Sequence, residues 1–218
     1  MNLLTWALDL LFPPKCPFCR CILDEPRAPL CPDCQPKLPW LEGSAAFRKV
    51  EHTDGCWSAL EYKDEVRESI RRYKFTPVPA HGQPFGLLAA QCALDHPEIE
   101  AEVVTWTPLS RKHLAKRGFD QSKLLADEIG RRLNLPVEQF VEKYRETKQQ
   151  SLLDTPAKRR DNVKGAYRLR TGADVKGKKI LLVDDVVTSG ATLSACALVL
   201  KEHGAEQIWC VTVAQAGK

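Results

Sequence analysis

The residues best suited to chemistry form an apolar run that ends in two carboxylates and a loop of small and hydroxyl-bearing residues. Residues 180–187 read Ile-Leu-Leu-Val-Asp-Asp-Val-Val. The loop that follows consists of Thr188, Ser189, Gly190, Ala191 and Thr192. A loop of this kind in front of a helix directs backbone N–H groups and hydroxyls toward one point, which suits a phosphate. Asp184 and Asp185 beside it suit sugar hydroxyls or Mg²⁺.

This segment predicts a sugar-phosphate site of a less common type. The G-x-x-x-x-G-K-[ST] loop and the G-x-G-x-x-G dinucleotide fingerprint are both absent from it. Gly190 permits close approach of the backbone to a ligand. The alternative to a phosphate site is a solvated acidic turn that caps a helix. That alternative would not require two acids after a buried strand and a Thr-Ser-Gly-x-Thr loop together.

Four cysteines form a second candidate site, which would bind metal. Cys16-Pro-Phe-Cys19 and Cys31-Pro-Asp-Cys34 are two Cys-x-x-Cys turns separated by eleven residues. They supply four thiolates for a tetrahedral Zn²⁺ with no open position, so the predicted zinc is structural. A redox pair and an iron–sulfur cluster remain alternatives. Whether the nearby Cys21 takes part in metal binding stays open.

The composition fits one domain with an attachment. The chain has 218 residues, of which 44% are hydrophobic and 28% charged, and its net charge of +4 does not require a nucleic-acid partner. No apolar run approaches the ~18 residues of a membrane span. Residues 1–12 predict a short amphipathic helix that ends at Pro13 and lacks signal-peptide features. We therefore expect a cytoplasmic protein with free thiols and no membrane span.

Apolar periodicity predicts how these candidate sites are positioned. Strands are expected over 56–62, 103–106, 137–141, 179–183 and 208–213, and helices over 63–73, 84–95, 121–133 and 192–203. This alternation predicts an α/β fold with a parallel sheet covered by helices on both faces. Residues 1–45 would form the N-terminal helix and zinc module, and 46–218 the α/β domain.

The predicted helices also assign individual side chains to the core, to solvent or to a helix cap. In helix 63–73, Val66, Ile70 and Tyr73 are expected in the core. Arg67, Arg71 and Arg72 of the same helix are expected to face solvent. Asp120 is a suitable N-cap for the helix over 121–133.

Basic side chains gather in two segments near the predicted ligand edge of the sheet. Residues 109–134 hold seven Lys/Arg against three Asp/Glu, and residues 143–170 hold nine against three. Many of these cations are explained as solvated surface. The remainder suit a positive rim around an anionic ligand. Residues 145–162, which show no clear period, suit a lid over that ligand.

The string VDDVVTSGAT resembles the signature of type I phosphoribosyltransferases, which bind 5-phosphoribosyl-1-pyrophosphate (PRPP) with Mg²⁺. The resemblance implies a Rossmann-like parallel sheet. It assigns Asp184 and Asp185 to the ribose hydroxyls and the loop Thr188–Thr192 to the 5′-phosphate. It also implies a pyrophosphate loop after strand 103–106, made of the backbone amides of Leu109–Arg111 with Ser110, Arg111 and Lys112.

The whole chain resembles the ComF family of competence-type proteins, in which a zinc module precedes a phosphoribosyltransferase domain. The matching strings are LLFPPKCPFC, LCPDC, TPLSRKHLAKRGFDQSKLLA and the segment from TKQQSLL to KRRDNVKGAY. The resemblance implies transfer of ribose 5-phosphate from PRPP to an unidentified acceptor, linked to DNA uptake. The alternative function is a non-catalytic cytosolic adaptor that binds single-stranded DNA or a competence protein. Few aromatic residues, 7%, argue against strong DNA binding.

Overall fold

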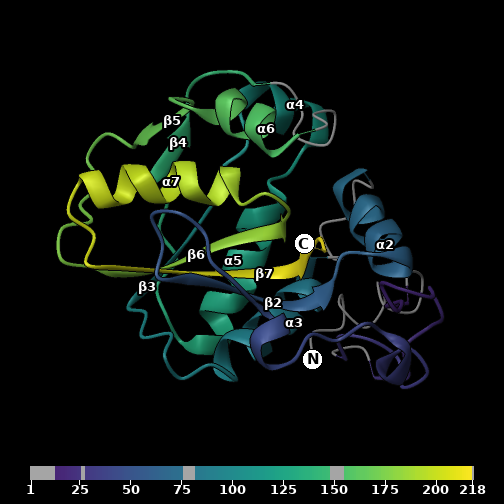
Figure 1. Ribbon diagram of the computed structural model, residues 1–218. Coiled ribbons are helices and arrows are strands. Elements are labelled where there is room, and N and C mark those ends of the chain that lie inside the picture. The colour runs from purple at the N-terminus through teal and green to yellow at the C-terminus, as the bar shows by residue number, and fades with distance from the viewer. Residues whose placement is uncertain (1–12, 26–27, 76–81, 148–154, 218) are drawn as a thin grey trace, which may run out of the picture.

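The computed structural model describes residues 13–25, 28–75, 82–147 and 155–217. Its centre is a five-stranded sheet with the order β1-β2-β7-β6-β3 (Figure 1). The strands are β1 (Phe47–Arg48), β2 (Gly55–Glu61), β3 (Val103–Trp106), β6 (Lys179–Val187) and β7 (Gln207–Gln215). Strands β2, β7, β6 and β3 run parallel, and β1 pairs antiparallel with β2 at one edge. The predicted parallel sheet is confirmed.

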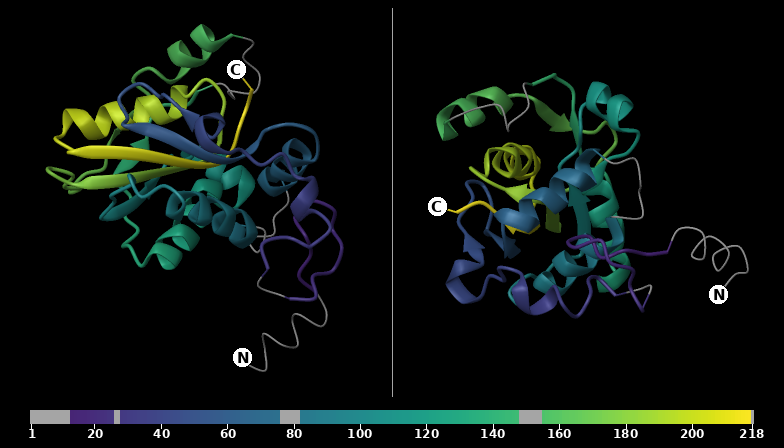
Figure 2. Two further views of the ribbon diagram at one scale, coloured as in Figure 1. Left: turned by 60° about the horizontal axis from the view of Figure 1, so that its bottom comes forward. Right: turned by 90° about the vertical axis from the view of Figure 1, so that its right-hand side faces the viewer.

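Helices cover both faces of this sheet because its strands alternate apolar side chains between the faces. Leu181 and Val183 of β6 pack toward α3 (Gly82–Leu94) and α5 (Gln121–Leu133). Ile180 and Leu182 pack toward α7 (Ala191–Glu202). Figures 1 and 2 show α7 above the sheet and α3 with α5 below it. The expected helix bounds differ from these by two residues or fewer.

A small second layer lies over α7. It consists of the antiparallel pair β4 (Val141–Lys143) and β5 (Tyr167–Leu169) together with α6 (Pro156–Val163). The predicted strand over 137–141 is wrong, because Val137 forms a single bridge to Val104 and the chain then leaves the sheet. Phe140 is buried in one apolar cluster with residues of α7, and pairing resumes at Val141 opposite Leu169.

Helix α6 includes part of the segment 145–162, for which the sequence shows no clear period. Thr155 caps this helix, because its side chain accepts a hydrogen bond from the Lys158 amide. Residues 148–154, which belong to the same expected lid, lie outside the described residues. The helix expected over residues 1–12 lies outside them as well. Among the described ranges, no helix combines the length and the apolar character that crossing a bilayer requires.

The cysteine-rich segment packs on α2 (Asp64–Phe75) and α3. The Phe18 ring meets the Phe85 ring edge-on with centroids 5.9 Å apart. Arg72 donates hydrogen bonds from Nη2 to the carbonyl oxygens of Pro17 (2.8 Å) and Phe18 (2.9 Å), and Ser69 Oγ donates to Pro17. The placement of Arg72 in solvent is therefore wrong. The domain boundary at residue 45 stays a prediction.

Close packing of α3 on α5 gives a test of this architecture. A Cβ at Gly86 of α3 would lie 2.6 Å from Glu128 Cβ of α5. We expect Gly86→Ala to destabilise the protein by about 1–3 kcal/mol, because overpacking outweighs the ~1 kcal/mol gain in helix propensity. Thermal unfolding would measure this loss.

The control for this substitution is Gln91→Ala on the exposed side of the same helix. It removes one exposed hydrogen bond, from Gln91 to Asp95, and adds no volume. Equal melting temperatures for the two variants would contradict the tight helix contact at Gly86.

Candidate functional site

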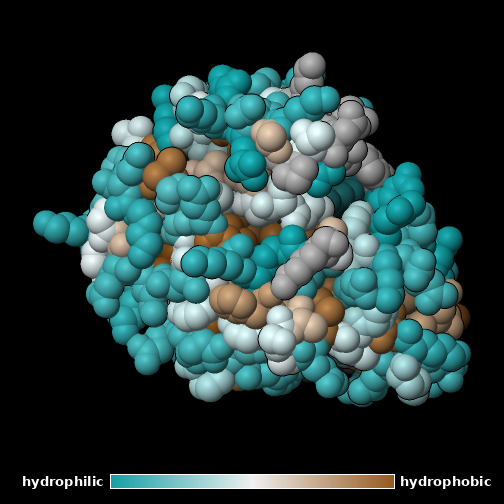
Figure 3. Space-filling model, in the orientation of Figure 1, coloured by the Kyte–Doolittle hydropathy of each residue, from teal (hydrophilic) through white to brown (hydrophobic). Residues whose placement is uncertain are grey.

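A cavity of about 750 Å³ lies where β6 and β3 end. Its lining comes from the end of β6 with the loop that enters α7, from the loop after β3 with α4 (Arg111–Arg117), from α2 and the start of α5, and from the layer of β4, β5 and α6. Hydrophilic side chains dominate the surface of α2 and α6 on either side of this region (Figure 3). Open parallel sheets bind ligands at this edge, so the cavity has the position that the sequence predicts.

Asp184 and Asp185 line the cavity at the end of β6. Asp184 Oδ1 accepts hydrogen bonds from Ser122 Oγ (3.0 Å) and from the Asp185 amide (2.9 Å), so this carboxylate is held in place. Asp185 Oδ1 lies 2.9 Å from Lys74 Nζ of α2. Burial and the neighbouring Asp185 raise the pKa of Asp184 to about 7.

The loop Thr188–Thr192 lines the cavity and leads into α7. Gly190 is the N-cap, and its φ of +74° lies in the left-handed region that favours glycine. Arg48 of β1 fixes this loop from behind by donating to the carbonyl oxygens of Thr188 and Ala216. Sequence reasoning missed Arg48, because nothing in its neighbourhood signals a partner 140 residues away.

The loop after β3 contributes Ser110 to the cavity. Ser110 caps α4 (Arg111–Arg117), lies 2.8 Å from His113 Nδ1 and donates to Glu146 Oε2 at 2.9 Å. The Leu109 amide donates to Asp120 Oδ2 at 3.1 Å. Arg111 and Lys112 are exposed on α4, outside the set of residues that lines the cavity. The structure thus brings Ser110 together with the acidic pair, and places Arg111 and Lys112 at the outer side of the loop.

Basic residues of α2 form a wall of the cavity, although the sequence predicted only that Arg67 and Arg71 face solvent. Arg67, Arg71 and Lys74 all line it. Their spacing of four and three residues is the available signal, because it places them on one helix face. The other lysines and arginines among the described lining residues are Arg117, Lys143 and Arg159.

Two buried polar atoms in this cavity have no hydrogen-bond partner among the residues that the structure describes. They are Nε2 of Gln121 and Oγ1 of Thr147. Gln121 is only 1% exposed, and its Oε1 already accepts from Arg117 at 2.6 Å. Unsatisfied buried donors are costly, so a ligand with acceptor oxygens would complete this site.

The four cysteines of the two Cys-x-x-Cys turns form a separate cluster. Their Sγ atoms all lie within 4.8 Å of one another. Those of Cys19 and Cys31 are 3.5 Å apart, close to the ~3.8 Å expected between thiolates of a tetrahedral zinc with 2.3 Å bonds. Cys16, Cys31 and Cys34 are buried. These ligands fit a structural zinc, and the exposed Cys21 lies outside the group of four.

Comparison with known proteins yields two family matches. A model described as phosphoribosyl transferase domain matches residues 115–218, and one described as double zinc ribbon domain matches residues 7–46. The second range contains the four clustered cysteines. The first contains the acidic pair and the loop at the start of α7.

Two named relatives resemble the chain to different extents. "Competence protein F" of Haemophilus influenzae is 26% identical over 93% of this chain and 97% of its own length. "DNA utilization protein YhgH" of Escherichia coli O157:H7 is 36% identical over 48% of this chain. That match spans about half, 46%, of the relative's length.

A solved structure with 23% sequence identity, described as the allosteric regulatory enzyme of purine biosynthesis, matches 65% of this chain and 29% of its own with a TM-score of 0.44.

The two family matches place a zinc ribbon before a phosphoribosyltransferase-type domain, in a chain that resembles Competence protein F over 93% of its length. The chain thus carries both family matches and is similar in sequence to proteins named Competence protein F and DNA utilization protein YhgH.

Proposed function

We propose that the cavity binds PRPP together with Mg²⁺ and that the protein transfers ribose 5-phosphate from it to an acceptor. One observation carries this proposal: two carboxylates and a hydroxyl-rich loop at a helix N-terminus line the same cavity, with Ser110 across from them. The phosphoribosyl transferase match over residues 115–218 supports it.

The residues divide into groups that suit the parts of PRPP. The loop Thr188–Thr192 suits the 5′-phosphate, because backbone amides at the start of α7 favour an anion. Asp184 and Asp185 suit the ribose hydroxyls as acceptors. Ser110, Arg111 and Lys112 suit the pyrophosphate, although the two cations lie outside the cavity lining and would act through movement of α4.

Divalent metal would enter with the substrate. Mg²⁺ prefers a few carboxylate or phosphate oxygens and retains water ligands, which two aspartates beside a diphosphate satisfy. When bound, it would neutralise charge on the departing pyrophosphate. Lys74 already neutralises Asp185, so Asp184 is the carboxylate available to it.

Transfer requires the bond between ribose C1 and the pyrophosphate oxygen to break while an acceptor atom bonds to C1. The pyrophosphate leaves with the electron pair, and the ribose becomes positively charged in passing. Fixed carboxylates stabilise that charge, and Lys143 of the lining stabilises the pyrophosphate. Burial lowers the pKa of His113, which keeps its imidazole neutral beside Ser110.

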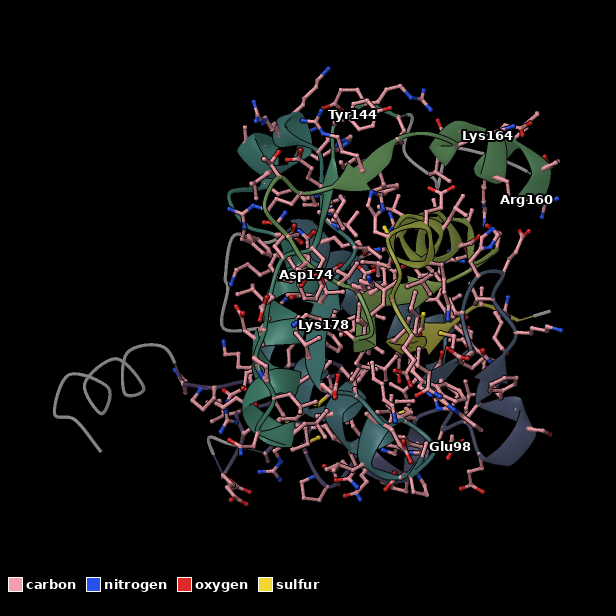
Figure 4. The ribbon with its side chains drawn as sticks, turned by 90° about the vertical axis from the view of Figure 1, so that its left-hand side faces the viewer. Glu98, Tyr144, Arg160, Lys164, Asp174 and Lys178 are labelled. Carbon is pink, nitrogen blue, oxygen red and sulfur yellow. The ribbon has the colours of Figure 1, made fainter. Side chains whose placement is uncertain are left out.

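Exposed groups on the layer over α7 support a second candidate function, a non-catalytic cytosolic adaptor for single-stranded DNA or a competence protein. Tyr144 is 55% exposed, and Arg168 lies over its ring at 5.1 Å. Tyr144, Lys164 and Arg160 lie along one end of the molecule, and Glu98 lies at the opposite end (Figure 4). An exposed aromatic ring among cations suits a nucleic-acid backbone with stacked bases.

Titration with PRPP and Mg²⁺ tests the proposed function. We expect micromolar-range binding by calorimetry, and release of pyrophosphate when a suitable acceptor is present. Asp184→Asn combined with Asp185→Asn should weaken binding at least about a hundredfold, since each removes a charge-assisted hydrogen bond of about 1.5–3 kcal/mol. Asp127→Asn, an exposed carboxylate on the outer side of α5, serves as the control.

The outcomes separate the two candidate functions. Absence of PRPP binding to the unaltered protein would refute the transferase. Binding without pyrophosphate release for any acceptor, together with salt-dependent affinity for a single-stranded oligonucleotide that Tyr144→Ala lowers, would favour the adaptor.

The pKa of Asp184 predicts a pH-dependent stability. In the unfolded chain this carboxyl titrates near 3.8, and in the folded protein near 7. The folded protein thus binds the extra proton between these values, and stability falls as pH rises toward 7. Asp184→Asn should therefore stabilise the unliganded protein by about 1–3 kcal/mol more at pH 8 than at pH 5. Thermal unfolding at both values would show this, and an equal effect at both would contradict it.

The zinc site predicts which thiols are indispensable. We expect one zinc per chain by elemental analysis. Cys34→Ser should lose it and unfold the N-terminal segment, whereas the matched variant Cys21→Ser should retain it. Loss of zinc from Cys21→Ser, or iron in place of zinc, would overturn the assignment of the four ligands.

A further inference from the structure

We propose that the acceptor of the ribose 5-phosphate is an anion, and that α2 is the wall of the cavity that selects it. This inference rests on the proposed function and names the substrate class that would use the remaining wall of the same site.

Three basic residues form a stripe along α2. Arg67, Arg71 and Lys74 occupy positions i, i+4 and i+7, and all three line the cavity. A second face of the helix, with Val66 and Ile70, is buried in the core. The cavity-facing stripe is therefore fixed by the burial of the adjacent face, and it cannot turn away without exposing that core.

The stripe carries more positive charge than its protein partners neutralise. Lys74 pairs with Asp185 at 2.9 Å. Arg67 and Arg71 share a single carboxylate, Glu68, at 4.0 and 3.1 Å. Their side chains are 58% and 57% exposed, and exposed ion pairs of this kind contribute little. The two guanidiniums can therefore exchange Glu68 for a ligand carboxylate or phosphate, which each binds in bidentate fashion.

The position of α2 in the fold separates its two arginines from the parts that suit PRPP, whereas Lys74 reaches Asp185 of β6. The acidic pair and the loop Thr188–Thr192 follow β6, and the loop with Ser110 follows β3, the neighbour of β6. Helix α2 follows β2, and β7 lies between β2 and β6. Figure 1 shows α2 on one side of this sheet edge, away from α4 and α6. The arginines thus border the side of the cavity away from the proposed pyrophosphate loop.

Helix α2 is also held firmly enough to act as a selective surface. Ser69 and Arg72 bind the carbonyl oxygens of the zinc-binding turn at Pro17 and Phe18. The Tyr73 hydroxyl donates to the Gln121 carbonyl oxygen at 2.8 Å on the side of α5. A pre-organised wall loses little entropy on binding, which favours discrimination between ligands.

The acceptor that fits this wall combines a nitrogen nucleophile with a carboxylate or phosphate. Its nitrogen lone pair forms the bond to ribose C1, the C1–oxygen bond breaks, and pyrophosphate leaves with that electron pair. Where the nitrogen carries a proton, that proton goes to water or to the pyrophosphate, and a pyridine nitrogen, which carries none, becomes cationic. A neutral base of the same shape would leave the two guanidiniums without a partner on the ligand.

Matched pairs of acceptors test the inference on the full-length, zinc-loaded protein saturated with PRPP and Mg²⁺. The pairs are nicotinate against nicotinamide, orotate against uracil, and anthranilate against aniline. Calorimetry measures binding, and pyrophosphate release measures turnover. We expect the anion of at least one pair to bind about tenfold to hundredfold more tightly than its neutral partner.

The variants identify the residues responsible. Arg67→Ala combined with Arg71→Ala should abolish the preference for the anion and leave the affinity for PRPP within about twofold. Arg67→Lys with Arg71→Lys should retain part of the preference, because the charge stays but the bidentate geometry is lost. The matched control is Arg131→Ala on α5, which is 59% exposed and also pairs with a glutamate three residues earlier. It should change neither measurement.

Distinct results overturn distinct claims. If PRPP does not bind, the proposed function fails and this inference fails with it. If PRPP binds but no anion is preferred over its neutral partner, the inference alone is wrong. A large loss of PRPP affinity in the alanine double variant would assign the arginines to the pyrophosphate instead. Loss of oligonucleotide binding without a change for the acceptor pairs would assign them to a nucleic-acid backbone.

Discussion

The structure depends on placing two adjacent carboxylates at the end of a buried strand. Charges in such a position are costly unless they are paired or hydrogen-bonded. Asp184 is held by Ser122 of α5, and Asp185 is held by Lys74 of α2. The two helices therefore meet at the acidic pair, where the Tyr73 hydroxyl of α2 also donates to the Gln121 carbonyl oxygen of α5. Because neither Ser122 nor Lys74 reaches the pair unless its helix is docked, the geometry of the cavity is tied to the packing of the whole α/β body.

The zinc-binding segment takes part in this arrangement through α2. Its turn at Pro17 and Phe18 accepts hydrogen bonds from one side of the helix, and Lys74 binds Asp185 from another. Cys16, Phe18 and Leu23 share one apolar cluster with Val183 and Val211 of the sheet. A closed four-sulfur site does no chemistry itself. Its expected contribution is to fix the backbone that orients α2, so the proposed ligand binding would depend on metal binding through a single helix.

The sequence predicts best what depends on neighbours along the chain. Strands β3, β6 and β7 and helices α5 and α7 follow from local apolar periodicity, and Asp120 caps α5 as expected. The acidic loop and the four-cysteine cluster follow from short spacings. Contacts between residues far apart in the sequence could not be predicted. These are the hydrogen bond from Arg48 to the Thr188 carbonyl oxygen, the ion pair of Lys74 with Asp185, and the hydrogen bonds from Arg72 to the zinc-binding turn. The strand expected over 137–141 failed because alternation alone does not show where a chain leaves its sheet.

Charge balance in the cavity connects these observations to ligand chemistry. Six lysines and arginines among the described lining residues surround two aspartates, although the chain as a whole carries only +4. Such a concentration of positive charge in a cavity makes the local electrostatic potential more positive and attracts anions. The 5′-phosphate and pyrophosphate of PRPP would meet part of it from the sides of β6 and β3. Because Mg²⁺ would return positive charge to the same site, an acceptor that brings further negative charge on the side of α2 would complete the balance.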